Sequence, residues 1–180
     1  MCQIHRSPGG LKPTMSHMTL DEIADLARHH LSANGCDAAN TAAISRTIVA
    51  AERDGAHSHG LFRLPGYVKS LRSGKVNGRA DPALVRPVPG VLKVDGDGGY
   101  APLAQERALA PLAEIARSQG VAVCGLTNIY HFAALWPEVE ALAEKGLAAL
   151  AVTAAFPYVA PAGGREALLH QSDGLRMAAP

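Results

Sequence analysis

Apolar positions near the N-terminus recur at helical spacing. From Leu20 to Leu31 they fall three or four residues apart, which places them on one face of a helix. Thr19 and Glu22 form the pattern of a capping box before this helix, and Asn34-Gly35 is a typical helix end. A second helix is predicted from about Asp37 to Arg53, because Ile44, Ile48 and Ala51 keep the same spacing. A third, short helix opens at Pro65-Gly66 and ends near Gly74.

The pattern changes after this third helix. The stretch ADPALVRPVPG, residues 80–90, is rich in proline and is interpreted as a connector. Beyond it, the short apolar stretches VLKVDG, VAVCGLTN and LAALAVTAA have the character of strands. The longer stretches between them, APLAQERALAPLAEIARSQG and WPEVEALAEKG, have the character of helices. This alternation predicts parallel βαβ units.

Composition and charge exclude several classes of protein. The chain has 180 residues, enough for one domain, and its 17 Lys and Arg nearly balance its 16 Asp and Glu. With a formal charge of +1, the chain lacks the excess of positive charge that is typical of proteins that bind nucleic acids or anionic membranes. The apolar runs are too short to span a bilayer. Three widely spaced cysteines, Cys2, Cys36 and Cys124, argue against disulfides or a metal site and favour a cytoplasmic protein.

The stretch DGAHSHGLFRLPGYV, residues 54–68, is the first candidate site and is expected to be a loop after the second helix. His59 can give or take a proton near neutral pH, and Ser58 can orient its ring. The planar fork of Arg63 matches a carboxylate. Such a pair suits a small 2-oxo, 2-hydroxy or 2-imino acid. Alternatively, one histidine caps the helix and Arg63 pairs with a surface acid; His57 has no evident role.

Two further stretches are candidates. TNIYHFAALW, residues 127–136, follows a predicted strand and precedes a helix, where α/β proteins place ligands. It lacks the GxGxxG pattern of an ordinary dinucleotide site, and His131 could equally be a core histidine. TAAFPYVAPAGG, residues 153–164, runs through Pro157 into two glycines, which predicts either a buried turn or a loop that shapes a pocket.

Together, these stretches resemble the malate/L-lactate dehydrogenase superfamily of the non-Rossmann type. AERDGAHSHGLFRLPGYV is most similar to the branch that reduces the cyclic imines Δ1-piperideine-2-carboxylate and Δ1-pyrroline-2-carboxylate. YHFAALWPEVEALAEKGL points to the same branch, because malate-type members usually read NHFGAAG there. The resemblance covers about Thr19 to Leu168. It implies an α/β fold in which an N-terminal helical segment precedes an incomplete βαβ-type sheet.

The resemblance also implies roles for the candidate residues. Ser58 supports His59, which donates a proton to the substrate, and a family aspartate completes this relay. Arg63 holds the substrate carboxylate, and the region of Pro157 touches the substrate. NADPH, or NADH, is the implied cofactor and a homodimer is the implied assembly. The residues implied to line the cofactor site are His131, Phe132, Ala133, Ala134 and Leu135.

Two other functions stay open on the sequence. The chain could serve a dehydrogenase of 2-hydroxy acids such as malate, lactate or ureidoglycolate. It could also be a non-catalytic fragment that at most associates with other chains. The second alternative arises because members of the superfamily are about twice as long, and the relay aspartate lies in the half that this chain lacks.

The resemblance divides the chain into four parts. Residues 1–18 are expected to be a disordered arm, 19–75 the helical segment with the Ser-His motif, and 76–169 a partial α/β cofactor-binding domain. Residues 170–180 read HQSDGLRMAAP, where the family shows GTNP after its glycine turn. Suitable codons for this tail encode TNPMAFAWPR in another frame, so we expect a frameshift near Leu169. A tail of this origin should be disordered or packed incidentally.

Overall fold

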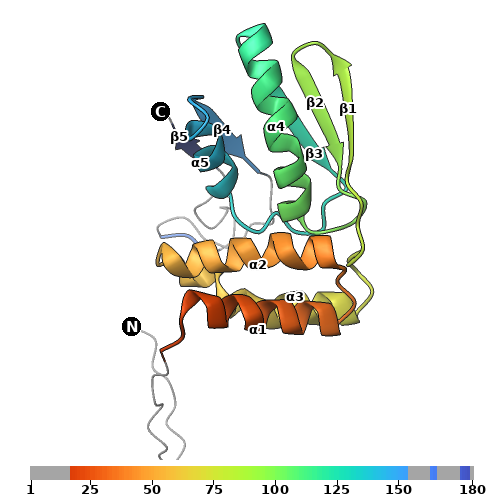
Figure 1. The fold of residues 1–180 in the computed structure, drawn as a ribbon, viewed down its shortest axis with the longest axis vertical. Coiled ribbons are helices and arrows are strands. Elements are labelled where there is room, and N and C mark those ends of the chain that lie inside the picture. The colour runs from red at the N-terminus through yellow and green to blue at the C-terminus, as the bar shows by residue number, and fades with distance from the viewer. Residues whose placement is uncertain (1–16, 154–162, 166–174, 179–180) are drawn as a thin grey trace, which may run out of the picture.

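The computed structural model describes residues 17–153, 163–165 and 175–178, arranged in two layers. Figure 1 shows α1, α2 and α3 in one layer, with α4 and a three-stranded sheet standing on it. A small unit of α5 and two strands lies beside α4. The α/β class predicted from the sequence is confirmed. The predicted arm lies almost entirely outside the described residues.

The helical layer follows the predicted pattern closely. α1 spans Leu20–Ala33, α2 spans Ala38–Arg53 and α3 spans Leu64–Arg72. The capping box is present, since Thr19 Oγ1 accepts from the N–H of Glu22 and Glu22 Oε2 accepts from the N–H of Thr19. Leu20, the first residue of the predicted apolar face, is 41% exposed because it lies in the first turn. The core of this layer contains Ile23, Ala27, Leu31, Cys36, Ile44, Ile48, Leu64, Tyr67, Val76 and Tyr100.

A βαβ unit forms the second layer, as the alternation predicted. β2 (Val91–Asp95) pairs in parallel with β3 (Val123–Thr127), and α4 (Ala101–Gln119) is the crossover between them. α4 packs on the sheet through a second apolar core. This core contains Leu92, Val94, Ala104, Ala108 and Ile115.

The Pro-rich stretch is not a plain connector, contrary to the prediction. Residues Ala83–Val88 form β1, an edge strand that pairs antiparallel with β2. The register shifts between Val85 and Val88, and Pro87, which lacks an N–H, falls in this irregular part. Pro89-Gly90 then closes the hairpin, where the carbonyl of Pro89 accepts from the guanidinium of Arg86. An edge strand can therefore carry the prolines that suggested a connector.

The last predicted strand does not extend the parallel sheet. β4 (Ala149–Val152) follows α5 (Pro137–Ala143) and pairs antiparallel with β5 (Leu175–Ala178) in a separate two-stranded sheet. β5 lies in the tail for which disorder or incidental packing was expected. Its four residues have a paired backbone, so the expected disorder does not apply to them.

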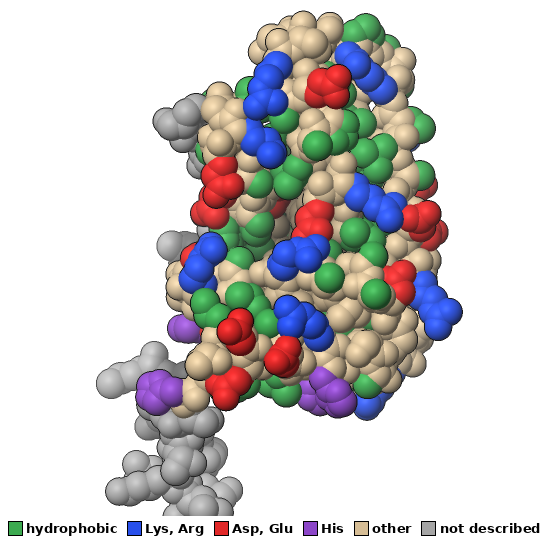
Figure 2. Space-filling view, in the orientation of Figure 1, with side chains coloured by type: hydrophobic (Ala, Val, Ile, Leu, Met, Phe, Trp, Pro, Cys, Tyr) green, Lys and Arg blue, Asp and Glu red, His purple; other side chains and the backbone are tan. Residues whose placement is uncertain are grey.

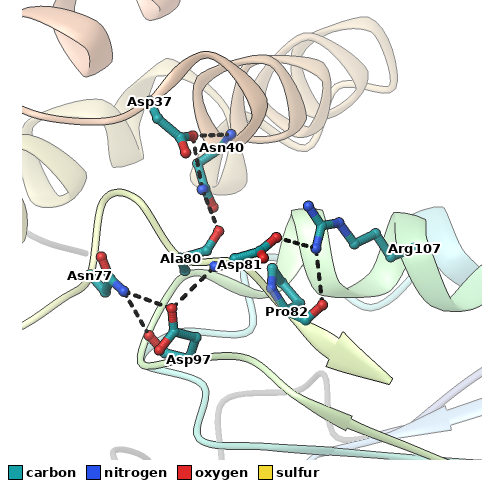
Figure 3. Close-up of polar contacts among 8 residues, drawn as sticks. All are labelled: Asp37, Asn40, Asn77, Ala80, Asp81, Pro82, Asp97 and Arg107. Carbon is teal, nitrogen blue, oxygen red and sulfur yellow. Dashed lines mark hydrogen bonds and ion pairs between the residues drawn. The ribbon is translucent and has the colours of Figure 1, made fainter. Parts of the chain in front are cut away.

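A polar network joins the two layers (Figure 3). Asn40, on α2, is buried, and its Nδ2 donates to the carbonyl of Ala80 at 2.9 Å and to Asp37 Oδ1 at 3.0 Å. Nearby, Asp97 Oδ2 accepts from Asn77 Nδ2 and from the N–H of Asp81. Arg107 of α4 donates to Asp81 Oδ1 and to the carbonyl of Pro82. The segment between α3 and β1 is thus held from both layers.

We expect Asn40→Ala to destabilise the protein by about 1–3 kcal/mol, because it leaves the carbonyl of Ala80 without its side-chain donor in a buried place. Urea unfolding followed by circular dichroism measures this loss. Gln119→Ala removes an exposed amide at the end of α4 and serves as the control. Equal unfolding midpoints for the two variants would show that the network does not stabilise the junction.

Charged side chains of both signs are interspersed over the face shown in Figure 2. This agrees with the near balance of acidic and basic residues in the sequence. Within the described ranges, no helix has the length and apolar character needed to cross a membrane.

Candidate active site

The Ser-His motif lies in tight helical turns rather than in an open loop. His57–His59 form one turn of 3-10 helix, η1, and Leu61–Arg63 form a second, η2, which leads directly into α3. The turns are built from local hydrogen bonds: the N–H of His59 donates to the carbonyl of Ala56, and that of Arg63 donates to the carbonyl of Gly60. The predicted loop is therefore an ordered connection between α2 and α3, which gives its side chains fixed directions.

Ser58 and His59 are in contact, as the motif suggested. Ser58 Oγ lies 3.0 Å from His59 Nδ1, and the His59 ring meets the ring of Trp136 edge to face at a centroid distance of 5.4 Å. If the hydroxyl donates to Nδ1, the neutral imidazole carries its hydrogen on Nε2. A ring protonated on both nitrogens would instead donate from Nδ1 to Ser58 Oγ, and this form can give up its Nε2 proton as a general acid.

Arg63 lies one turn after His59 and is tied to the same motif. Its Nε donates to the carbonyl of Ser58 at 2.9 Å, which fixes the plane of the guanidinium. The alternative that Arg63 serves only to pair with a surface acid is not needed to explain its position. Both Arg63 and His59 line one broad groove of about 1630 Å³, whose other walls are α4, β3, α5 and β4.

His131 is a half-buried histidine whose ring faces the same groove. The N–H of Ala133 donates to His131 Nδ1 at 3.0 Å, so the neutral ring carries its hydrogen on Nε2. Burial, and then the charges of Arg63 and His59, lower the pKa of His131 to about 4. The ring is therefore an uncharged hydrogen-bond donor at neutral pH. It also packs edge to face on Tyr67.

The other proposed cofactor residues divide into two groups. Phe132 and Leu135 line the groove, whereas Ala133 and Ala134 are buried and do not. Ala133 has a φ of 67°, in the left-handed region that alanine rarely adopts, and such strain often marks functional segments. Pro157, proposed to touch the substrate, lies outside the described residues.

Two residues at the start of α5, Trp136 and Glu138, were not singled out in the sequence, and Glu138 lines the groove. Trp136, the single tryptophan, contacts His59, although the two residues are 77 positions apart in the sequence. Glu138 on α5 has one carboxylate oxygen bonded to Gln105 at 3.1 Å, while its buried Oε2 has no hydrogen-bond partner within the described part of the chain. Burial raises the pKa of Glu138 to about 7. A cluster of three or more metal-binding side chains is not found among the described residues.

A family model for malate/L-lactate dehydrogenases matches residues 18–179. The chain belongs to the malate/L-lactate dehydrogenase family. Relatives include Δ1-pyrroline-2-carboxylate reductase of Pseudomonas fluorescens, 45% identical over 83% of this chain and 44% of the relative. A Δ1-pyrroline-2-carboxylate/Δ1-piperideine-2-carboxylate reductase of Pseudomonas aeruginosa is 47% identical over 84% of this chain and 46% of its own length.

Solved structures of family members agree with the fold. Δ1-piperideine-2-carboxylate reductase of Pseudomonas syringae superposes with a TM-score of 0.72 at 39% identity, over 76% of this chain and 41% of that one. Malate dehydrogenase of Pyrococcus horikoshii gives a TM-score of 0.82 at 26% identity, over 96% and 49%. The chain thus spans less than half the length of these family members.

Burial of Glu138 and of His131 in this chain has opposite consequences for the dependence of stability on pH. The pKa of Glu138 in the folded chain, about 7, exceeds its usual value of 4.5, so its contribution to stability falls as pH rises from 4.5 to 7. The pKa of His131, about 4, lies below its usual 6.5, so its contribution rises as pH rises from 4 to 6.5. The two effects oppose each other between pH 4.5 and 6.5.

Removing one group should therefore reveal the other. We expect the melting temperature of Glu138→Gln to rise more steeply with pH between 4.5 and 6.5 than that of the wild type, because only the His131 effect remains. The substitution removes the pH-dependent contribution of Glu138 to stability, which is on the order of 3 kcal/mol between pH 4.5 and 7. Thermal melts across this range measure it. His131→Phe should show the reverse slope, and parallel curves for all three proteins would contradict both shifts.

Proposed function

We propose that the chain carries the substrate-binding and proton-donating part of an NAD(P)H-dependent reductase of cyclic imino acids. The substrate is Δ1-pyrroline-2-carboxylate or Δ1-piperideine-2-carboxylate, and the product is proline or pipecolate. One observation carries this proposal: His59 and Arg63, a proton donor and a carboxylate-binding group, project from adjacent turns into one groove. The names of the relatives in two Pseudomonas species support the choice of an imino acid.

In the proposed reaction, His59 acts as the imidazolium: Nδ1–H donates to Ser58 Oγ, and the Nε2 proton passes to the imine nitrogen, which leaves a neutral ring with its hydrogen on Nδ1. When bound, the nicotinamide cofactor supplies a hydride to the imine carbon, so the C=N bond becomes a C–N single bond and a neutral secondary amine results. Ser58 holds the His59 ring through Nδ1, which fixes both its orientation and the position of its proton. After turnover, His59 takes a proton from water.

Arg63 orients the substrate in this scheme. Its Nε is engaged with Ser58, so the outer nitrogens of the guanidinium are the ones offered to a carboxylate. Ser58 contacts His59 through its hydroxyl and Arg63 through its carbonyl. The proton donor and the group that binds the substrate carboxylate are therefore held at a fixed separation. His131, uncharged and with Nε2–H as donor, adds a neutral polar group to the groove.

The groove suits one end of a nicotinamide dinucleotide. Phe132, Leu135 and His131 offer ring and apolar surfaces of the kind that pack against a nicotinamide. The groove offers no comparable partner for the cofactor phosphates among the described residues. Arg63 is the one Arg or Lys among the described residues that line it, and we assign Arg63 to the substrate carboxylate. The described part of the chain would therefore hold the nicotinamide end of NADPH or NADH.

The whole reaction needs more protein than this chain provides. The relatives are more than twice as long as the region that matches, and we propose that their remaining half supplies the relay aspartate and the phosphate contacts. The complete protein would act as a cytoplasmic homodimer. By itself, the 180-residue chain would be inactive, as the fragment hypothesis also states.

A chimera tests the function. It joins the matched part of this chain to the remaining half of the Pseudomonas aeruginosa relative, which is 47% identical. We expect this chimera to oxidise NADPH with Δ1-pyrroline-2-carboxylate or Δ1-piperideine-2-carboxylate, and to act poorly on pyruvate and oxaloacetate. Preference for the oxo acids would assign a 2-hydroxy acid dehydrogenase instead. Loss of all activity, with a correctly folded chimera, would favour a non-catalytic chain.

A further inference from the structure

Glu52 lies in the last turn of α2, directly against the two turns that carry the Ser-His motif. Its Oε2 is 2.6 Å from His57 Nδ1, and its Oε1 accepts from the N–H of Leu61 at 2.7 Å. These partners are the first residues of η1 and η2. One carboxylate therefore bridges the two turns, and Ser58 and His59 lie between its points of attachment.

Burial distinguishes this pair from an ordinary surface ion pair. The Glu52 side chain is 14% exposed, whereas that of His57 is 73% exposed. A carboxylate that is largely removed from water needs hydrogen-bond donors, and the turns supply two. His57 does not line the groove, in contrast to Ser58 and His59. The contact with Glu52 explains the presence of His57, to which the sequence analysis could give no role.

Gly60 provides independent evidence for the importance of this contact. Its φ is −86°, so a left-handed φ is not the reason for glycine at this position. However, a Cβ at this position would lie 2.1 Å from Glu52 Oε1 and 2.5 Å from its Cδ. A larger residue at position 60 would therefore force the Glu52 side chain out of the position in which it contacts His57 and Leu61.

We propose that Glu52, together with His57, is a positioning residue for His59. By fixing both ends of the segment from His57 to Leu61, it keeps Ser58 Oγ against His59 Nδ1 and keeps the Ser58 carbonyl against Arg63. The catalytic meaning of this arrangement rests on the proposed function, in which His59 donates the proton. The geometric part does not depend on it.

The geometric part is tested on the 180-residue chain by NMR of its histidine side chains. In Glu52→Ala and in His57→Ala we expect the ring resonances of His59 to move toward those of an exposed histidine, while those of His131 stay in place. Glu52→Gln should preserve most of the wild-type signal, because an amide oxygen still accepts from Leu61 and the amide nitrogen can donate to His57. Glu106→Gln, which alters the α2–α4 contact to Arg46, is the control.

The catalytic part is tested by kinetics in the chimera. We expect Glu52→Ala to lower kcat about 10- to 100-fold with a smaller change in KM, as misplacement of a catalytic group does, and Glu52→Gln to recover most of this loss. Unchanged His59 resonances in both Glu52→Ala and His57→Ala would overturn the proposal. If Glu52→Ala does not fold, His57→Ala decides alone. Moved resonances in a chimera that reduces no imino acid would leave the positioning role standing and reject the proposed function.

Discussion

Replacing His59 by alanine is expected to lower kcat of the chimera by about 10²–10⁴-fold, the usual contribution of general acid catalysis. The reason is geometric. Ser58 holds Nδ1 of His59, and His59 lines the groove, so the proposed proton comes from Nε2 of this ring. His131 cannot replace it as an acid at neutral pH, because its pKa of about 4 is set by burial. Steady-state kinetics with a saturating imino acid measures the loss.

Two variants control this result. His29→Ala removes an exposed histidine of α1 and should leave kcat unchanged. Ser58→Ala should lower kcat about 2- to 10-fold, because it removes one hydrogen bond to the His59 ring and not the acid itself. Turnover of His59→Ala within a factor of about three of wild type would reject the assignment of the proton donor.

Replacing Arg63 by lysine is expected to raise KM for the imino acid by about 10- to 150-fold, with a smaller effect on kcat. A hydrogen bond to a charged group typically contributes about 1.5–3 kcal/mol, and each 1.4 kcal/mol corresponds to a factor of ten. Lysine keeps the charge, but it lacks the planar fork and the Nε that the Ser58 carbonyl fixes. Initial rates over a range of imino acid concentrations separate KM from kcat.

The matched control is Arg72→Lys on α3. Arg72, like Arg63, has an Nε that donates to a protein oxygen, in this case Asn34 Oδ1, but it does not line the groove. An equal rise in KM for both variants would show that the effect is general electrostatics. An unchanged KM for Arg63→Lys would show that another group binds the carboxylate.

Local sequence rules predicted most of the helices and the βαβ unit. Thr19 with Glu22, and Asp37 with the N–H of Asn40, are caps that neighbouring residues determine by themselves. The motif of Ser58 and His59 was likewise found from adjacent positions, and its contact is between neighbours in sequence. Features governed by a few consecutive residues can be derived without knowledge of the fold.

Features that depend on distant residues could not be derived in this way. The prolines of β1 indicated a connector, because nothing local shows that this strand lies at a sheet edge where a missing N–H is tolerated. β4 pairs with β5, a segment distant in sequence, and the hydrophobic pattern within either segment does not indicate which strand it will pair with. Trp136 contacts His59 from a distant part of the chain, and the bridge from Glu52 to Leu61 crosses a helix end, where 3.6-residue spacing no longer applies.

The close approach of Gly60 to Glu52 imposes an order on evolutionary change in this chain. A larger residue at position 60 meets the carboxylate at 2.1 Å, so it is disfavoured for as long as Glu52 is present. If a shorter side chain replaces Glu52 first, the space opens and position 60 becomes free to vary. The two positions are thus epistatic, and the accessible mutational path runs through position 52 before position 60. Once position 60 has changed, a glutamate restored at position 52 must take another side-chain conformation, so the hydrogen bonds to His57 and Leu61 do not return with it.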